Sequence, residues 1–357
     1  MILLVIAAIA AAYQLFAILA CLAHRRHPIL ASKLPSPVSV LKPIRGADAG
    51  LKEAIASHVA LQGHFEFLCG VRNLDDPAVP LLGMFPNVRV IECHTTMPNG
   101  KAGVLMDLVK AARFPVLVVN DADIRVEPDY LARVTAPLCD PAVGLVTCLY
   151  RAHGDTFASR FEALGVSTEF APSTLVARLT GVDEFALGST LAFRRADLDR
   201  IGGFAAVADY LADDYQLGHR VHALGLKCVL SDVVVDTHLS GTWDDVWRHQ
   251  LRWARTVRVS KFFGYLGLPV TFATLWAVVS AAFGQWDVAL GLLAVRMAMA
   301  IVAGWFVMRS RDVLRLWFLI PLRDLYGAAV WCVGLFGDSV IWRGQRLRLD
   351  REGRILR

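Results

Sequence analysis

Two aspartates directly follow a short apolar run, and they are the first candidates for chemistry in this sequence. Val116 to Val119 has the length of a strand, and Asp121 and Asp123 lie just beyond it. Apolar side chains on both faces are typical of a buried central strand. In open α/β sheets, ligands lie beyond the carboxyl ends of such strands. Carboxylate oxygens suit Mg²⁺ or Mn²⁺, so Asp121 and Asp123 predict a metal site, the alternative being a solvated turn.

The elements before this strand alternate between strands and helices. Strands are predicted over residues 38–44, 65–73 and 87–93, and helices over residues 51–61 and 99–112. This succession of strands and helices predicts an α/β fold with a mostly parallel sheet and right-handed crossovers.

Charged residues gather in the loops that follow these strands. Lys42 and Arg45 end the first strand, Asp75 and Asp76 follow the second, and Lys101 begins the helix over 99–112. Each loop alone has the ordinary polarity of a loop. The joint occurrence of the first two loops with Asp121 and Asp123 at strand ends predicts a nucleotide-binding site with a metal ion, and Lys101 is assigned to the same site.

A second acidic pair opens a later helix. Asp213 and Asp214 begin a helix that is predicted to run to Leu224, where Gly225 stops it. Acidic residues in a first turn complement the helix dipole, so capping is the simplest explanation. The functional alternative is that one carboxylate caps while the other projects into the cleft as a general base, and Asp213 is assigned to the nucleotide site.

A glycine interrupts the strand-like run from Phe185 to Phe193. Gly188 sits inside this run, and a glycine in a strand often lets a ligand or another backbone approach closely. A strand is predicted over residues 144–150, and helices over 157–170 and 196–201.

The stretch from Thr242 to Lys261 predicts an amphipathic helix. Its apolar stripe consists of Trp243, Val246, Trp247, Leu251, Ala254 and Val257. Its basic flank consists of Arg248, Arg252, Arg255, Arg258 and Lys261. One interpretation lays the helix on a membrane surface. The other closes His249, Arg252 and Trp253 over a nucleotide, because a planar guanidinium group binds oxyanions in two-pronged fashion. The two interpretations are compatible.

The composition is too apolar for an ordinary soluble protein, with 55% hydrophobic residues and a mean hydropathy of +0.47. Met1 to Ala23 is an uncharged stretch of transmembrane length. His24 to His27 follows, and this basic end is expected in the cytoplasm. The seven scattered cysteines fit a reducing compartment. The net charge of +5 indicates contact with anionic lipid rather than nucleic acid.

The C-terminal region is also predicted to enter the membrane. Residues 262–283 and 286–308 are each long enough to span it, as a hairpin. Arg296 lies mid-span and is explained equally by a lipid head group or acidic partner, or by a buried pair with Asp324. Residues 314–337, broken at 321–324, are predicted to re-enter or lie in the interface, because the positive-inside rule keeps the basic end of the chain cytoplasmic.

The expected organisation follows from these segments. It comprises an N-terminal transmembrane anchor over residues 1–24, an α/β domain over 38–241, an interface helix over 242–261, a C-terminal membrane region over 262–337 and a basic cytoplasmic tail over 338–357.

Five motifs in this order resemble the ceramide glucosyltransferase family. They are KPIRG at 42–46, DDPA at 75–78, DADIRV at 121–126, ADDY at 212–215 and HQLRW at 249–253. The resemblance implies a membrane-bound inverting glycosyltransferase with a GT-A fold, a UDP-sugar donor and a divalent cation. It also implies uridine and ribose contacts at Asp75 and Asp76, and a catalytic base at Asp214.

The resemblance further implies that Asp121 and Asp123 bind metal and diphosphate and that Arg252 and Trp253 form the motif's final Arg-Trp. His249 stands where the motif has Gln or Arg, and Ala171 stands where animal members have histidine. The sequence is therefore more similar to the bacterial branch associated with hopanoid biosynthesis.

The expected reaction is transfer of N-acetylglucosamine or glucose to a hydroxyl group of a membrane lipid, either a hopanoid polyol or ceramide. The enzyme would lie in the bacterial inner membrane as a multi-pass protein, with its catalytic domain in the cytoplasm. Two alternatives stay open. One is a processive polysaccharide synthase, which shares DxD and QxxRW motifs, and the other is an inactive membrane scaffold that binds anionic lipid.

Overall fold

The computed structural model describes residues 1–26 and 36–356. The chain forms two compact units. The sheet unit comprises Pro28–Tyr150, Val182–His238 and Arg354–Arg357. The helical unit comprises Met1–His27, Arg151–Gly181 and Leu239–Gly353.

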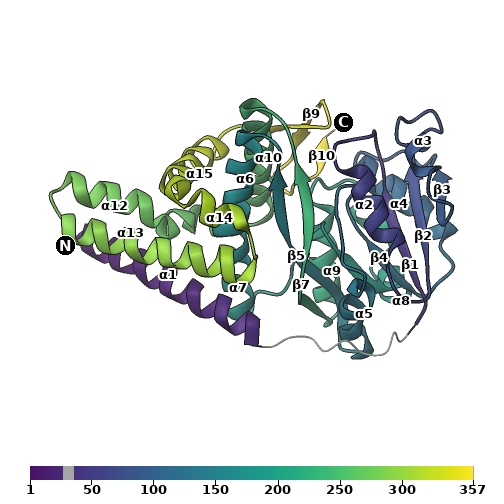
Figure 1. Cartoon of the computed structure of the whole chain (residues 1–357), viewed down its shortest axis with the longest axis horizontal. Coiled ribbons are helices and arrows are strands. Elements are labelled where there is room, and N and C mark those ends of the chain that lie inside the picture. Colours follow the sequence, from purple (N-terminus) through teal and green to yellow (C-terminus); the bar gives the residue numbers. More distant parts are fainter. Residues whose placement is uncertain (27–35, 357) are drawn as a thin grey trace. The chain divides into compact units, whose positions relative to one another are not determined.

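A seven-stranded, mostly parallel sheet forms the centre of the sheet unit, as predicted (Figure 1). Its strands, in spatial order, are β3 (Val88–Glu92), β2 (Phe65–Val71), β1 (Val38–Pro43), β4 (Val116–Val119), β6 (Leu191–Arg194), β5 (Val143–Gly154) and β7 (Lys227–Leu239). The first four are parallel to one another, whereas β6 runs antiparallel to both of its neighbours.

Two apolar cores cover the two faces of this sheet. In β4, Val116 and Val118 face one core and Leu117 and Val119 face the other, all of them buried. Alternation of this kind is what a strand buried on both faces requires. The first core includes α2 (Leu51–Val59) and α5 (Tyr130–Thr135), and the second includes α4 (Gly100–Ala111), α8 (Arg195–Arg200) and α9 (Asp213–Ala223). Short elements complete the unit: α3 (Val79–Leu82), η1 (Ala136–Cys139), η3 (Phe204–Val207) and β10 (Ile355–Leu356).

The strand register brings the predicted site loops to one edge. Leu41 of β1 pairs with Val119 of β4, and Val119 also pairs with Leu191 at the start of the antiparallel β6. The loops after β1, β2 and β4 therefore meet the loop before β6. The DxD aspartates and Gly188 lie in these loops.

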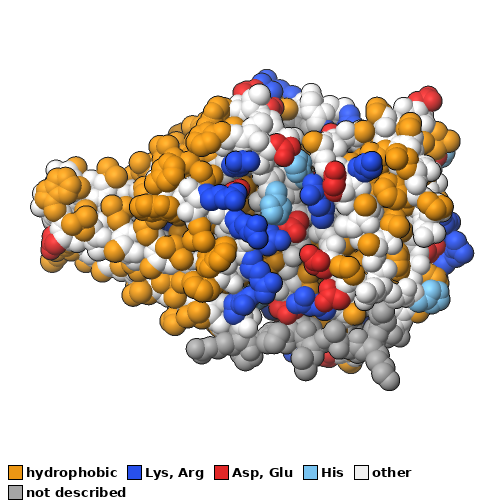
Figure 2. Space-filling model, viewed as in Figure 1, with side chains coloured by type: hydrophobic (Ala, Val, Ile, Leu, Met, Phe, Trp, Pro, Cys, Tyr) orange, Lys and Arg blue, Asp and Glu red, His pale blue; other side chains and the backbone are white. Residues whose placement is uncertain are grey.

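Three long apolar helices pack side by side in the helical unit (Figure 1): α1 (Ile2–Arg26), α12 (Ala273–Ala282) and α13 (Trp286–Ile301). Small side chains allow their close approach, among them Ala7, Ala10, Ala273 and Ala277. Two helical stretches are long and apolar enough to cross a membrane, Ile2–Arg25 and Trp286–Val307, the latter continuing α13 into η5 (Val302–Val307). Figure 2 shows the apolar side chains that coat these helices.

The other C-terminal segments differ from the straight spans that the sequence suggests. Residues 262–283 form α11 (Phe262–Gly267), η4 (Leu268–Thr271) and α12, with a bend of 51°. The bend falls at Phe272, whose ψ of 66° is not helical. The break predicted at 321–324 is misplaced. Pro321 lies in the first turn of α15 (Ile320–Gly334), after α14 (Arg311–Arg315) and η6 (Trp317–Leu319).

Arg296 forms the buried pair that was one of its two explanations. Its Nε and Nη2 donate to the two carboxylate oxygens of Asp324 at 2.9 and 2.6 Å, and Thr274 Oγ1 also donates to Asp324. Three helices, α12, α13 and α15, are thus joined by one polar contact in an apolar setting. The prediction of a pair with Asp324 is confirmed.

The remaining helices of the helical unit cover much of the predicted amphipathic stripe. α6 (Phe157–Gly165) continues through η2 (Val166–Phe170) into α7 (Ala171–Leu179). In α10 (Trp243–Ser260), Trp243 packs edge-on against Phe161 of α6, and Trp247 packs against Tyr326 of α15. Protein therefore covers much of the stripe that we expected at the membrane interface.

The segment predicted as a basic tail is folded. β8 (Ser339–Trp342) and β9 (Gln345–Leu349) pair as an antiparallel hairpin with a two-residue turn, Arg343-Gly344. Both turn residues have positive φ, 48° and 76°. The many arginines of this segment led us to predict a basic tail and not a pair of strands.

Candidate active site

Lys101 joins two of the predicted site carboxylates. Its Nζ lies 2.6 Å from Asp121 Oδ1 and 3.6 Å from Asp213 Oδ2. Lysine in a first helical turn opposes the dipole of α4, so the carboxylates are needed to hold it there. Burial alone would lower the pKa of Lys101, but the neighbouring carboxylates, Asp121 foremost, leave that pKa above its ordinary value. The ammonium group is therefore a fixed positive charge.

Gly188 lies where these groups converge. A methyl group on its Cα would lie 3.2 Å from Asp121 Oδ2, 3.2 Å from Asp214 Oδ2 and 3.4 Å from Lys101 Nζ. The sequence predicted that a ligand or backbone would approach a glycine inside a strand; Gly188 instead lies in the turn before β6, and the atoms that approach it belong to three side chains. Because Gly188 has no side chain, the carboxylates of Asp121 and Asp214 and the ammonium group of Lys101 can converge on the position that a Cβ atom would occupy.

Asp214 is held by two backbone amides. Gly188 N donates to its Oδ2 and Tyr215 N to its Oδ1, both at 2.8 Å. Burial, and next the charge of Asp213, raise the pKa of Asp214 to about 6. We predicted that one aspartate would cap α9 and the other would face the cleft. In the structure Asp214 does both, because it accepts from the first-turn amide of Tyr215 and from Gly188 N. Asp213 faces Lys101 instead.

Lys42 does not face the ligand-binding side of this edge. It is fully buried, and its Nζ donates to the carbonyl oxygens of Asp121, Ala122 and Ile124 at 2.7, 3.3 and 3.1 Å. Burial lowers its pKa to about 8. The predicted nucleotide contact at Lys42 is therefore replaced by a positioning role, because its donors are used on the DxD loop itself. Asp123, the second carboxylate of that loop, accepts a hydrogen bond from Thr237 of β7.

Asp76 also positions backbone. Gly46 N lies 3.0 Å from both of its carboxylate oxygens, and Ala78 N donates to its Oδ1 at 2.9 Å. Asp76 thereby ties the loop after β2 to the loop after β1. Asp75 and Arg45 are exposed in the same two loops, where a ligand at this edge could reach them. Their predicted ligand contacts stay predictions.

The donor set at this edge suits a cation that is shared with a substrate. Among residues 1–26 and 36–356, no cluster of three or more His, Cys, Asp or Glu side chains could hold a metal ion alone. Mg²⁺ usually uses one or two carboxylates, with substrate phosphates and water completing its shell. Asp121, 40% exposed in its side chain, fits that pattern.

The residues of the HQLRW motif lie in the helical unit, on α10. His249 Nδ1 lies 2.6 Å from Glu162 Oε1, which also accepts from Gln250 Nε2 at 2.7 Å. Gln250 Oε1 accepts from the buried Arg323 at 2.9 Å. His249 and Trp253 are in edge contact at 4.6 Å, and Trp253 also contacts Phe170. Arg252 lines a pocket with His249.

Several of these positioning residues were not predicted. Asn120 Nδ2 lies 2.9, 2.8 and 3.2 Å from Tyr130 Oη, Ser189 O and Thr190 Oγ1, and its Oδ1 lies 3.2 Å from His58 Nε2. This buried network fixes the end of β4. Thr237 was missed with β7, although the run CVLSDVVV over residues 228–235 is rich in β-branched residues, which favour a strand. Glu162 signals itself as a lone carboxylate in an apolar helix, and Gln250 follows His249 directly.

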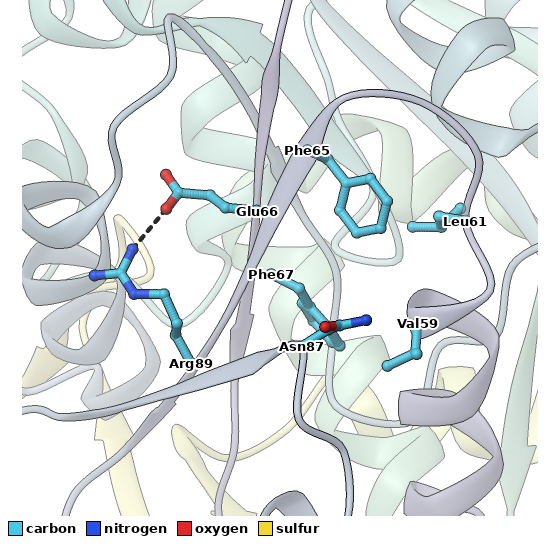
Figure 3. Close-up of a pocket in the computed structure, with 7 residues that line it drawn as sticks. All are labelled: Val59, Leu61, Phe65, Glu66, Phe67, Asn87 and Arg89. Atoms are coloured by element: carbon cyan, nitrogen blue, oxygen red, sulfur yellow. Dashed lines mark hydrogen bonds and ion pairs between the residues drawn. The ribbon is translucent and has the colours of Figure 1, made fainter.

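A pocket of about 420 Å³ lies at the other edge of the sheet (Figure 3). It is lined at the amino ends of β2 and β3, where Glu66 forms an ion pair with Arg89 at 2.6 Å. Ligands of open α/β sheets bind at the carboxyl ends, so this pocket is separate from the candidate site.

The fold is found in a solved glycosyltransferase. The mannosyltransferase PcManGT from Pyrobaculum calidifontis, in complex with GDP-Man and Mn²⁺, matches 93% of this chain and 99% of its own, with a TM-score of 0.57 and 20% identity. This likeness concerns the fold, and it confirms the predicted GT-A architecture.

Sequence relatives point to one family. Ceramide glucosyltransferases 1 and 3 of Caenorhabditis elegans are each 29% identical to this chain, over 204 and 210 residues. The matches span 54% and 56% of this chain but only 44% and 45% of the relatives. The model of glycosyl transferase family 21 matches residues 2–355. The resemblance drawn from the five motifs is thereby confirmed, and the chain belongs to glycosyl transferase family 21.

Proposed function

We propose that this chain is an inverting glycosyltransferase that moves a hexose from a UDP-sugar to a hydroxyl group of a membrane lipid. The observation that carries the proposal is the convergence of Lys101, Asp121 and Asp214 around Gly188 at the carboxyl edge of the sheet. We propose N-acetylglucosamine or glucose as the hexose, and a hopanoid polyol or ceramide as the acceptor.

Asp214 is the proposed general base. A hydroxyl group is a poor nucleophile until a carboxylate takes its proton as it attacks. The two amides at 2.8 Å fix the carboxylate, and a pKa raised to about 6 makes it a stronger base than an ordinary aspartate while leaving it ionised at neutral pH. A single displacement by the activated hydroxyl inverts the anomeric carbon.

Lys101 and Asp121 are proposed to bind the donor phosphates. Asp121, with Asp123 behind it, would hold Mg²⁺ or Mn²⁺, which would neutralise charge on the leaving diphosphate. The solved mannosyltransferase in complex with GDP-Man and Mn²⁺ supports ligands of this kind. Lys101 adds a positive charge, and Lys42 holds the loop rigid through three carbonyls. The roles proposed for Asp75, Arg45, His249, Arg252 and Trp253 follow their motifs.

A lipid acceptor is supported by the apolar helices of the same chain and by the names of its relatives. The stretches Ile2–Arg25 and Trp286–Val307 have mean hydropathies of 2.6 and 2.0. We propose a multi-pass protein of the bacterial inner membrane, with the sheet unit in the cytoplasm.

The test is transfer by the purified chain in nanodiscs. UDP-N-acetylglucosamine and UDP-glucose are each offered with a hopanoid polyol and with ceramide, and the lipids are analysed by mass spectrometry. We expect a lipid that carries one hexose in β linkage, since the donor is α-linked. A long-chain product would indicate the polysaccharide synthase instead, and absence of transfer and hydrolysis across all pairs would indicate the inactive scaffold.

Gly188→Ala should lower transfer strongly without unfolding the chain. The added methyl group would occupy the space between Asp121, Asp214 and Lys101, at 3.2–3.4 Å from each. Displacing reacting groups by about 1 Å costs roughly 10²-fold in rate. Gly83→Ala is the matched control, because its methyl group would meet only ordinary contacts at 3.6 Å. Equal turnover of both variants, measured at saturating donor, would remove Gly188 from the site.

A further inference from the structure

The arginines of α10 form two groups: Arg255 and Arg258 bind backbone carbonyls, whereas Arg248 and Arg252 line a pocket. Arg255 donates to Phe336 O and Ser339 O, and Arg258 donates to the carbonyl oxygens of Gly334, Leu335 and Gly337. These carbonyls end α15 and begin the hairpin, so the two arginines anchor the base of β8 on α10. Glycine is needed at 337, where φ is +79° and a side chain would meet Arg255 at 2.8 Å.

The anchored hairpin closes a pocket over the first half of α10. The pocket has a volume of about 330 Å³, and the charged or titratable residues of its lining are Asp245, Arg248, His249, Arg252 and Arg343. Asp245 is already engaged in capping, since it accepts from Thr242 N and Thr242 Oγ1 at 2.8 Å. Arg248 pairs with Asp244 at 2.6 Å. Three guanidinium groups, those of Arg248, Arg252 and Arg343, thus face the two carboxylates of Asp244 and Asp245, so positive charges outnumber negative ones among these residues.

Arg343 occupies a strained position in this pocket wall. Two-residue hairpin turns with positive φ at both positions are dominated by Asn-Gly and Asp-Gly. Here an arginine holds φ at +48° before Gly344. A non-glycine residue in this region costs stability and persists where the surroundings fix it, often at functional sites. Arg343 therefore lines the pocket from a turn position at which asparagine would be more stable.

We infer that this pocket binds a phosphate oxyanion and that Arg343 is one of its ligand-binding residues. Arginine pairs with phosphate through two parallel hydrogen bonds, and several guanidinium groups converging on one pocket match the several oxygens of a phosphate or diphosphate group. That chemistry has two sources for this chain: the diphosphate of a nucleotide-sugar and the phosphate of an anionic lipid. The inference rests on the proposed function only for the first source.

The variant Arg343→Asn tests the inference. Asparagine favours this turn, so the hairpin should be retained while the guanidinium group is lost. Arg351→Asn is the matched control, since it removes the same charge from an exposed turn position of the same unit, outside the pocket. Both variants are purified in neutral detergent with EDTA, which prevents metal-dependent binding at Asp121. The shift of the thermal unfolding midpoint is then titrated with inorganic pyrophosphate and, separately, with dioctanoyl-phosphatidylglycerol.

We expect Arg343→Asn to weaken binding of one probe about tenfold, the effect of losing a charge-assisted hydrogen bond, and Arg351→Asn to leave it unchanged. Loss confined to pyrophosphate identifies a soluble diphosphate as the ligand, and loss confined to phosphatidylglycerol identifies a lipid phosphate. Unchanged affinity for both probes, or equal losses in the two variants, overturns the inference. Because no sugar transfer is measured, a failed transferase assay leaves this result intact.

Discussion

Asp214→Asn is expected to lower the rate of sugar transfer about 10²- to 10⁴-fold, the usual contribution of a general base. The affinity for UDP should stay close to that of the wild type, because Lys101 and Asp121 remain. Asparagine has one oxygen acceptor where aspartate has two. One of the two backbone N–H groups that now donate to Asp214 would therefore face the side-chain NH2 group of asparagine and lose its hydrogen bond. Turnover at saturating donor and UDP binding by calorimetry separate the catalytic effect from any local rearrangement.

Protonation gives an isosteric version of the same change. Burial raises the pKa of Asp214, so its basic form is lost as the pH falls through about 6, well above the range of an ordinary aspartate. The wild-type rate should therefore decline below that pH, and the residual rate of Asp214→Asn should lack that limb. Asp199→Asn, an exposed carboxylate on α8, should leave both rate and pH profile unchanged. Reduced UDP binding with transfer preserved in Asp214→Asn would assign this carboxylate to the donor instead.

The strand-end residues could be located from the sequence because their positions follow from general rules. An apolar run of four residues predicted β4, and its carboxyl end placed Asp121 and Asp123 at the same edge as the loops after β1 and β2. Gly188 was also singled out as a position of close approach, although side chains, and not a ligand or backbone, approach it in the turn before β6. These rules concern backbone position, which periodicity and glycine report directly.

Side-chain direction could not be obtained in the same way. Lys42 ends a strand beside acidic loops, and its charge suggested a phosphate contact. The structure buries it under the DxD loop, where three carbonyls take its hydrogen bonds. Asp76 likewise binds amides of two loops. A sequence shows that a charge reaches an edge, but the partner that it selects there depends on the packing of loops from distant parts of the chain.

Breaking the ion pair between Arg296 and Asp324 should destabilise the helical unit severely. Asp324→Asn would leave the guanidinium group of Arg296 buried, at 3% exposure, without its carboxylate. Removing one partner of a buried pair typically costs about 3–5 kcal/mol. We expect a lower midpoint of thermal unfolding and a lower yield of folded protein in detergent. Fluorescence-detected size-exclusion chromatography measures both.

The double variant Arg296→Met/Asp324→Leu shows whether the charge left behind causes that loss. Two apolar side chains of similar volume need no partner, and replacement of a buried pair in this way is often neutral or stabilising. Thr274, which donates to Asp324, would lose this acceptor in the double variant, and the loss of one neutral donor's hydrogen bond costs less than an unpaired buried charge. We therefore expect the double variant to melt well above Asp324→Asn, with a strong coupling in the double-mutant cycle. The cycle compares the double variant with Arg296→Met and Asp324→Leu. If the loss of stability in the double variant equals the sum of the losses in these two single variants, the two residues act through independent packing contacts and not through their charges.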